Sequence, residues 1–361
     1  MRVLIDYRAA LRERTGVGEY THQLVRALLG VARTDPGGCP LDVTVFSSSA
    51  RDRLRYDPDL AGARRVDRRI PVRLLNLAWH RLGWPPVEAL THAPVDVAHS
   101  LHPLLLPARG AQVVTIHDLN FLAHPERTRA EIRRDYPALA RSHAHRADQV
   151  IVVSQFTAGE VERQLDVPRA KIAVCSPGGP AWQPRTAPPR DGYVLFFGTL
   201  EPRKNLGALL DAYEALSATR HVPTLVVAGK ATEQSGPWLA RMKRAPLDRL
   251  VRHVGYVDPQ QRRDLYAGAR LLVQPSFEEG FGLPVLEAMT VGVPVVSADA
   301  GALPEVAGGA ALLVDPHDPS TIAAAIAQLL DDPDTAAACT ARGIDQQRRA
   351  AGHLRQGARI G

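Results

Sequence analysis

The chain has few cysteines, few aromatic residues and no long apolar run, and each shortage excludes a class of protein. Its 361 residues include three cysteines, Cys39, Cys175 and Cys339, which lie far apart. Disulfide frameworks and zinc sites need more cysteines at closer spacing, so we expect a protein of the reducing cytoplasm. No apolar run of about 18 residues occurs, so we predict no membrane-spanning segment. The N-terminal segment becomes charged too early for a secretory signal and is typical of a buried strand.

Aromatic residues make up only 5% of the chain, which has a net charge of +6. Because no recognition motif accompanies this charge, we predict no nucleic-acid partner. Arginines crowd one stretch: Arg51, Arg53, Arg55, Arg64, Arg65, Arg68, Arg69 and Arg73. This stretch has two interpretations, which are a solvated arginine-rich surface and an attraction to anionic lipid headgroups. The second would make the protein peripheral at the inner face of the cell membrane.

Short, β-branched apolar runs alternate with helical stretches along the whole chain. The runs before residue 180 are Val3–Tyr7, Val43–Ser47, Val95–Ser100, Val113–His117, Val150–Ser154 and Ile172–Ser176. The later runs are Tyr193–Gly198, Leu225–Gly229, Val251–Val257, Leu271–Ser276, Val293–Ser297 and Ala311–Val314. This alternation predicts an α/β protein with parallel sheets built from βαβ units. Most runs are apolar throughout, which is typical of strands covered on both faces.

Prolines and glycines concentrate between the two sets of strands, where neither a helix nor a central strand can form. We therefore predict an N-terminal domain over 1–178, a linker over 179–192, a C-terminal domain over 193–335 and an arginine-rich tail over 336–361. Two doubly wound domains joined in this way would leave a cleft. Ligands of such sheets bind at the carboxyl ends of the strands.

The segment from Glu279 to Met289, EGFGLPVLEAM, carries most of the chemical information. Its carboxylates, Glu279 and Glu287, stand eight residues apart, with two glycines and a helix start between them. A loop entering a helix binds anions through its amides and the positive end of the helix dipole. A carboxylate further along can bind sugar hydroxyls by charge-assisted hydrogen bonds. Phosphate and hydroxyl recognition together indicate a nucleotide sugar.

Three weaker motifs follow predicted strands. Gly16 and Gly18 lie at a strand-to-helix turn, which is a phosphate-binding turn or a plain tight turn. Arg203 and Lys204 follow another strand and either neutralise a diphosphate or form an exposed basic turn. His117 closes a third strand and is either an acid, base or donor to substrate, or structural.

No metal site is predicted. The histidine pairs His99/His102 and His143/His145 lack a third ligand at suitable spacing. The Asp-Pro-Asp segments 57–59 and 332–334 are typical of turns and helix caps.

Taken in order, these motifs resemble the retaining glycosyltransferases of family 4, which have the GT-B fold. The matching landmarks are TGVGEY at 15–20, HDL at 117–119, GTLEPRKN at 198–205, HVGYV at 253–257 and PSFEEGFGLPVLEAM at 275–289. The resemblance extends to about residue 330. It implies two Rossmann-like domains and sugar transfer from a nucleotide diphosphate sugar without a metal or further cofactor. The acceptor hydroxyl would attack on the same face of the sugar.

The resemblance also implies roles for individual residues. His117 and Glu279 would contact the transferred sugar, and Glu287 would bind the ribose hydroxyls. Other donor contacts would come from the loops and strand ends of both domains: Gly16, Gly18, Arg203, Lys204, Tyr256, Val257, Phe281, Gly282 and Leu283.

Two departures from the family pattern stand out. Thr199 occupies a position where many relatives carry arginine, so Arg203 would have to supply that charge. The tail lacks the aromatic-containing helix that usually crosses to the N-terminal domain, so we expect this helix to be missing or poorly packed.

Donor and acceptor remain open at this stage. GDP-mannose is the favoured donor, with UDP- and ADP-sugars as alternatives. The acceptor is a carbohydrate, a lipid-linked sugar or a small molecule, and its loops, such as 51–73 and 76–86, carry no transferable motif. An inactive partner subunit is the non-enzymatic alternative.

Overall fold

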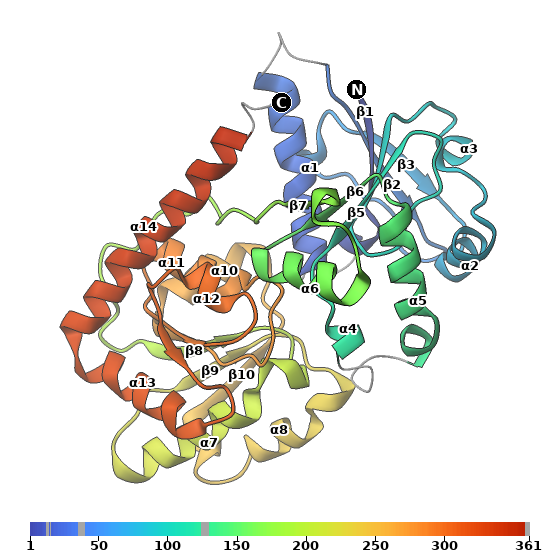
Figure 1. Ribbon diagram of the computed structural model, residues 1–361. Coiled ribbons are helices and arrows are strands. Elements are labelled where there is room, and N and C mark those ends of the chain that lie inside the picture. The colour runs from blue at the N-terminus through green and yellow to red at the C-terminus, as the bar shows by residue number, and fades with distance from the viewer. Residues whose placement is uncertain (12–13, 15, 35–39, 124–129, 358–361) are drawn as a thin grey trace. The chain divides into compact units, whose positions relative to one another are not determined.

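The structure is a computed structural model that describes residues 1–11, 14, 16–34, 40–123 and 130–357 (Figure 1). Cys39 lies outside these residues, and Cys175 and Cys339 are free thiols. The chain divides into two compact units, Met1–Cys175 and Ser176–Gly361. Within the described residues, no helix combines the length and apolar content that a bilayer crossing requires.

Unit 1 contains a parallel sheet whose described strands follow the order β3-β2-β1-β4-β5-β6-β7. The strands are β1 (Arg2–Asp6), β2 (Asp42–Ser48), β3 (Arg64–Arg68), β4 (Val97–Ser100), β5 (Ala111–Ile116), β6 (Gln149–Val152) and β7 (Ile172–Val174). The helices are α1 (Val17–Thr34), α2 (Val72–Leu82), α3 (Val87–Thr91), α4 (Asn120–Ala123), α5 (Ala130–Arg146) and α6 (Gln155–Leu165). All the strands predicted for this half are confirmed, but β3 was missed.

Alternate residues of β1 show how both faces of this sheet are covered. Val3 and Ile5 pack with Val25 of α1, whereas Leu4 packs with Leu75 and Trp79 of α2. The central strands are therefore apolar throughout, as two covered faces require. The missed strand β3 lies at the sheet edge and has one buried apolar residue, Val66. Its arginines are typical of an edge strand that resists pairing with another chain.

Unit 2 contains a parallel sheet with the described order β10-β9-β8-β11-β12-β13. These strands are β8 (Tyr193–Phe197), β9 (Leu225–Ala228), β10 (Val251–Gly255), β11 (Ala269–Gln274), β12 (Val295–Ala298) and β13 (Leu312–Val314), each one predicted. The helices are α7 (Leu206–Thr219), α8 (Gly236–Arg241), α9 (Leu247–Leu250), α10 (Pro259–Ala267), α11 (Leu283–Val291), α12 (Leu303–Ala307), α13 (Pro319–Asp331) and α14 (Pro333–Gly357). Helices α7 and α13 pack in one core cluster, and α10, α11 and α12 in the other, so the predicted α/β class with two doubly wound parallel sheets is confirmed.

The proline-rich segment and the tail both belong to unit 2 and pack against the rest of it. The backbone N–H of Arg185 donates to the Val291 carbonyl at 2.9 Å, and Trp182 packs 6.1 Å from the Tyr266 ring. The tail forms α14 within unit 2, so the expectation that it lacks a packed helix is wrong. The expectation that no helix crosses to the N-terminal domain stays a prediction. The helix packs on α11, with Gly343 beside Met289 and with Thr340 and Ile344 beside Gly292. Alanine, glutamine and arginine at most positions favour this helix even without aromatic residues.

Gly229 is required where the ends of β8 and β9 meet. Its φ is +146°, and a Cβ atom there would lie 1.8 Å from the carbonyl oxygen of Gly198. Because that neighbour is backbone, the clash can be relieved only by separating the two strand ends.

We expect Gly229→Ala to lower the unfolding free energy of unit 2 by about 2 to 3 kcal/mol, measured by urea unfolding. Gly236→Ala is the control, since its Cβ would meet no atom within 4 Å, and an equal loss in both variants would contradict this account.

Candidate functional site

Strands β8 and β11 are neighbours at the point where the strand order of unit 2 reverses. Ligands of open α/β sheets bind at the carboxyl edge of such a point. The loops that leave these two strands are joined there by hydrogen bonds. The Phe277 N–H donates to the Arg203 carbonyl at 2.9 Å. The Asn205 amide donates to the carbonyls of Pro275 and Pro316 at 3.0 and 2.6 Å, which fixes the turn carrying Arg203 and Lys204.

Glu279 lies at the centre of these loops, with only 5% of its surface exposed. Its Oε1 accepts from Lys204 Nζ at 2.5 Å, from Ser276 Oγ at 2.8 Å and from Gln274 Nε2 at 3.0 Å. Its Oε2 accepts from Arg203 Nη1 at 3.1 Å. The structure therefore brings Glu279, Arg203 and Lys204 together, as a carboxylate held between two cations.

The charges in this group are strongly coupled. Burial by itself would raise the pKa of Glu279, but the Lys204 and Arg203 charges and the hydrogen bonds from Lys204 and Ser276 lower it to about 2. Burial and the Arg203 charge lower the pKa of Lys204, while Glu279 opposes that change. Arg203 Nε also pairs with Glu201 Oε2 at 3.0 Å, so the two cations of this group are matched by two carboxylates. Arg203, with 24% of its side chain exposed, is the more accessible of the two cations, and Lys204 is almost fully enclosed.

Glu287 forms a second buried group with residues of α10. Arg262 binds it through both oxygens, with Nη2 2.7 Å from Oε1 and Nε 3.0 Å from Oε2. The Tyr266 hydroxyl donates to Oε2 at 2.8 Å. The Arg262 guanidinium also lies 4.9 Å from the centre of the Phe197 ring. The sequence did not single out Arg262 or Tyr266, and helical spacing alone does not connect α10 with α11.

The other donor residues predicted in unit 2 lie at the start of α11 and after β10. Gly282 precedes the first residue of α11 with φ +109°, and a Cβ there would come within 2.6 Å of the Leu303 side chain. Phe281 and Leu283 flank it, so three successive backbone N–H groups stand at the start of the helix. Tyr256 and Val257 follow β10; Tyr256 is exposed and Val257 packs against the core.

The donor residues predicted in unit 1 are Gly16 and Gly18, at the start of α1, and His117, which contacts α1 through Tyr20. Gly16 adopts φ +46° directly before α1, and a Cβ at Gly18 would lie 2.7 Å from the Ala9 carbonyl oxygen. Tyr20, one turn into α1, places its ring edge-on to His117 with centroids 4.8 Å apart. The helix start and the histidine are thus linked by ring packing.

His117 is held as a neutral imidazole with one ring nitrogen available. Burial lowers its pKa to about 4, although a hydrogen bond to the Leu101 backbone and the Asp118 charge act in the opposite direction. Nε2 is buried and has no hydrogen-bond partner within the described residues. A neutral ring that donates from Nδ1 leaves Nε2 as an acceptor. The geometry suits acceptance from a ligand hydroxyl better than donation.

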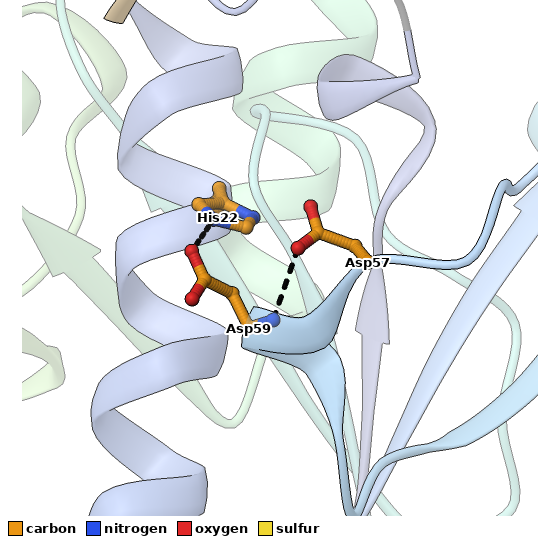
Figure 2. Close-up of side chains that lie close together, drawn as sticks. All are labelled: His22, Asp57 and Asp59. Atoms are coloured by element: carbon orange, nitrogen blue, oxygen red, sulfur yellow. Dashed lines mark hydrogen bonds and ion pairs between the residues drawn. The ribbon is translucent and has the colours of Figure 1, made fainter. Parts of the chain in front are cut away.

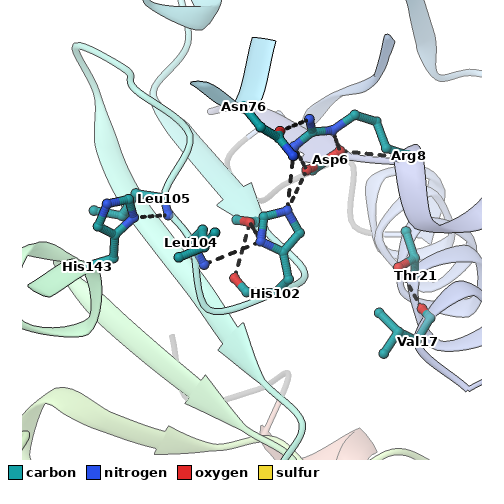
Figure 3. Close-up of polar contacts among 10 residues, drawn as sticks. Asp6, Arg8, Val17, Thr21, Asn76, His102, Leu104, Leu105 and His143 are labelled. Carbon is teal, nitrogen blue, oxygen red and sulfur yellow. Dashed lines mark hydrogen bonds and ion pairs between the residues drawn. The ribbon is translucent and has the colours of Figure 1, made fainter. Parts of the chain in front are cut away.

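A further polar group at the ends of β1 and β4 was not predicted (Figure 3). Asp6 binds Arg8 through both oxygens, with Nε and Nη2 at 2.8 and 2.6 Å, and lies 3.3 Å from His102 Nε2. Arg8 Nη1 also donates to Asn76 at 2.8 Å. Although burial opposes it, the Arg8 charge holds the pKa of Asp6 well below its usual range. The sequence did hold an indication of this group, since an aspartate ending a buried strand is unusual.

Two family models match the chain, one to each unit. The model described as glycosyltransferase family 4 matches residues 14–179, and the model described as glycosyl transferases group 1 matches residues 182–346. The chain belongs to this glycosyltransferase family. The recognition made from the motifs is therefore confirmed.

Solved structures agree with the fold of this family. Sucrose-phosphate synthase from Thermosynechococcus elongatus superposes with a TM-score of 0.75 at 21% identity, covering 99% of this chain and 98% of that one. HepE from Anabaena, solved with UDP and glucose, gives 0.72 at 18% identity over 99% and 98%. WaaG, a glycosyltransferase of lipopolysaccharide biosynthesis, gives 0.70 at 15% identity over 96% and 95%. At these identities the likeness shows the fold alone, which is GT-B.

Curated relatives in the family are more similar in sequence over shorter ranges. O-antigen chain mannosyltransferase B of Escherichia coli is 36% identical over 255 residues, which are 65% of each chain. D-inositol 3-phosphate glycosyltransferase of Corynebacterium efficiens is 30% identical over 244 residues, or 58% of each. The chain thus spans less than two thirds of the length of either relative.

A possible cation site lies in unit 1, where the side chains of His22, Asp57 and Asp59 are close enough to share an ion (Figure 2). The contacts already made by their ligand atoms indicate a structural role instead. His22 Nδ1 lies 2.7 Å from the Tyr7 hydroxyl, and Nε2 lies 3.2 Å from Asp59. Asp57 caps the short helix Pro58–Leu60 and pairs with Arg14. Asp332 likewise accepts from the N–H groups of Asp334 and Thr335 at the start of α14, so the predicted caps are confirmed.

We expect Glu279→Gln to destabilise unit 2 because the buried Lys204 and the half-buried Arg203 would lose the counter-charge that they share. At pH 7 the loss in unfolding free energy should be on the order of 3 kcal/mol. The pKa of Glu279 is lowered in the folded state, from 4.5 to about 2. Its stabilising charge is therefore fully present above about pH 4.5 and is lost as the pH falls towards 2.

Urea unfolding of the wild type and the variant at a series of pH values tests this linkage. The difference in unfolding free energy should shrink between pH 4.5 and the lowest pH at which the chain stays folded. Glu233→Gln, at an exposed position, is the matched control and should show no such trend. A difference for Glu279→Gln that stayed constant with pH would refute the coupling.

Proposed function

We propose that the protein is a retaining, metal-independent hexosyltransferase. It moves a hexose, with mannose as the best candidate, from a nucleotide diphosphate sugar to an acceptor hydroxyl in envelope polysaccharide or glycolipid synthesis. The observation that carries this proposal is the buried Glu279–Lys204–Arg203 group at the strand-order reversal of unit 2. The 36% identity to an O-antigen chain mannosyltransferase supports mannose, and GDP-mannose is the corresponding donor.

Arg203 and Lys204 would bind the diphosphate, together with the backbone N–H groups at the start of α11. Their positive charge is held in place by Glu279 before any ligand arrives. Pre-positioned charge of this kind stabilises a leaving group without reorganisation during the reaction. It would also supply the charge that many relatives take from an arginine at the position of Thr199.

Glu287 would accept hydrogen bonds from the ribose hydroxyls, with Tyr256 and Val257 near the base. Arg262 and Tyr266 hold the Glu287 carboxylate in one orientation. Fixed orientation lowers the entropy lost when the donor binds.

In the proposed reaction, the bond between the anomeric carbon and the diphosphate oxygen breaks. The acceptor oxygen bonds to that carbon from the same face, and the leaving diphosphate takes the acceptor proton. Glu279 already accepts four hydrogen bonds from its neighbours. This arrangement favours an electrostatic role beside the sugar over that of a covalent nucleophile.

His117 would accept a hydrogen bond from a hydroxyl of the transferred sugar through Nε2, while Gly16 and Gly18 would approach the phosphates. The neutral state of His117 suits this role, because a protonated ring could not accept. A small-molecule acceptor is the second candidate. The similarity to a D-inositol 3-phosphate glycosyltransferase favours it over an inactive partner subunit.

Release of nucleoside diphosphate from GDP-mannose, UDP-glucose and ADP-glucose tests the activity. We expect a thermal shift and turnover with one donor, and a loss of about 100-fold or more in kcat/KM for Lys204→Ala. Lys243→Ala, at an exposed lysine outside the site, should retain activity.

Proton NMR of the product should show the anomeric configuration of the donor. Inversion would refute the retaining mechanism, and neither binding nor turnover with any donor would refute the function.

Arg262→Leu tests the role of Glu287 in donor binding. The variant leaves the carboxylate without its bidentate partner, so KM for the donor should rise about 10-fold or more while kcat changes less. Arg262→Lys should restore part of the affinity, since it retains the charge but not the bidentate geometry. Arg263→Leu on the same helix is the control. Equal KM values in Arg262→Leu and Arg263→Leu would contradict the role of Arg262.

A further inference from the structure

Helix α2 has apolar side chains on two sides, and only one side is packed. Leu75 and Trp79 lie in the core of unit 1, with 2% and 3% of their surfaces exposed. Leu74 and Leu77 lie on the other side with 61% and 58% exposed, and Leu82 and Trp84 at the end of the helix are 74% and 66% exposed. Single exposed apolar residues are ordinary, but a group of four on one short segment indicates an interaction surface.

Basic residues accompany these apolar side chains, and acidic ones are absent from the same segment. The sequence has no aspartate or glutamate between Asp67 and Glu88. Arg69, Arg73 and Arg81 are exposed. Arg73, Leu77 and Arg81 are spaced four residues apart, so they share one face of the helix, with Leu74 next to it. Asp67, which precedes the segment, is paired with Arg53 at 2.9 Å.

Leucines and a tryptophan between arginines suit one partner in particular. An interfacial helix inserts its apolar side chains below the headgroups, while arginine extends to the phosphates above them. Tryptophan is enriched at this same depth. A protein groove would match the leucines but would have to bury the three arginines, at a desolvation cost that hydrated lipid phosphates do not impose.

We propose that the exposed surface of segment 69–84 binds the surface of an anionic phospholipid bilayer. This surface consists of the outer face of α2, with Arg73, Leu74, Leu77 and Arg81, and of Arg69, Leu82 and Trp84 at the ends of the helix. The surface consists of residues of unit 1, whereas the carboxylate groups of the proposed donor site belong to unit 2. It therefore operates whether or not the proposed donor chemistry is correct. Of the two interpretations that the arginine-rich stretch leaves open, the structure favours lipid attraction for the part around α2.

Flotation of the full chain with unilamellar vesicles tests the proposal. We expect partition onto vesicles containing about one third phosphatidylglycerol, little onto pure phosphatidylcholine, and weaker binding as salt rises. Replacing Arg69, Arg73 and Arg81 by glutamine should lower the partition coefficient about fivefold per residue, because each basic residue near the surface contributes about 1 kcal/mol. Arg348→Gln, at a side chain with 71% exposure in α14, is the charge control.

A double variant, Leu74→Gln with Leu77→Gln, tests the apolar part. It should reduce binding at least 10-fold without lowering Tm, since both side chains are exposed. The matched control is Leu313→Gln in unit 2, where the side chain is 44% exposed. Tryptophan emission of the wild type should shift to shorter wavelength on anionic vesicles. Trp84→Phe should abolish that shift, because Trp79 is already buried and Trp182 and Trp238 belong to unit 2 and not to the proposed surface.

Three results of the vesicle experiments would overturn the proposal. These are absence of binding to anionic vesicles, equal binding to both vesicle types, and wild-type binding by the leucine double variant. Light scattering adds a further check. If the wild type is a dimer and the double variant a monomer, the face joins two copies of the chain and the lipid assignment is wrong. Donor-dependent thermal shifts should be unchanged in every α2 variant, so failure here and failure of the proposed transfer activity are distinguishable.

Discussion

The structure depends on one arrangement of charge, a carboxylate buried between two cations. Glu279 is removed from water, where its charge would be unfavourable without partners. Lys204 and Arg203 compensate it, and Ser276 and Gln274 complete its hydrogen bonds. Because Lys204 and Arg203 follow β8 while Glu279 follows β11, this group also fixes the two loops relative to each other. The proposed donor site is therefore formed before a ligand is present.

The parallel topology makes that arrangement possible. Strands β8 and β11 run in the same direction as neighbours, so the loops that follow them leave the sheet at the same edge. The apolar strands carry no chemistry themselves; they determine where the polar loop residues meet. The same principle applies in unit 1, where Asp6 ends β1 and His102 follows β4. These strands are also neighbours at a reversal of strand order. Each unit thus gathers its buried charges at the carboxyl edge of its own sheet.

Sequence patterns predicted the central strands because two covered faces demand unbroken apolar runs. They failed at β3, where Arg64, Arg65 and Arg68 surround one buried valine. An edge strand is partnered on one side, so its sequence is governed by protection of the free edge more than by burial. The stretches 51–73 and 76–86, interpreted as loops, accordingly contain β3 and most of α2. The tail was expected to lack a packed helix because it has no aromatic residues. Helix propensity and contacts with α11 are nevertheless sufficient to form α14.

The sequence by itself determined the family, the α/β class and the positions of Glu279, Glu287, Arg203, Lys204 and His117, because short motifs encode local turns and strand ends. Tertiary structure alone decided their partners. Arg262 meets Glu287 only because α10 packs beside α11, and Nε2 of His117 is left as an acceptor only because Leu101 binds the other side of the ring. Likewise, the packing of Trp79 and Leu75 on the sheet decides which leucines of α2 face solvent. Such contacts join residues distant along the chain, and no local pattern records them.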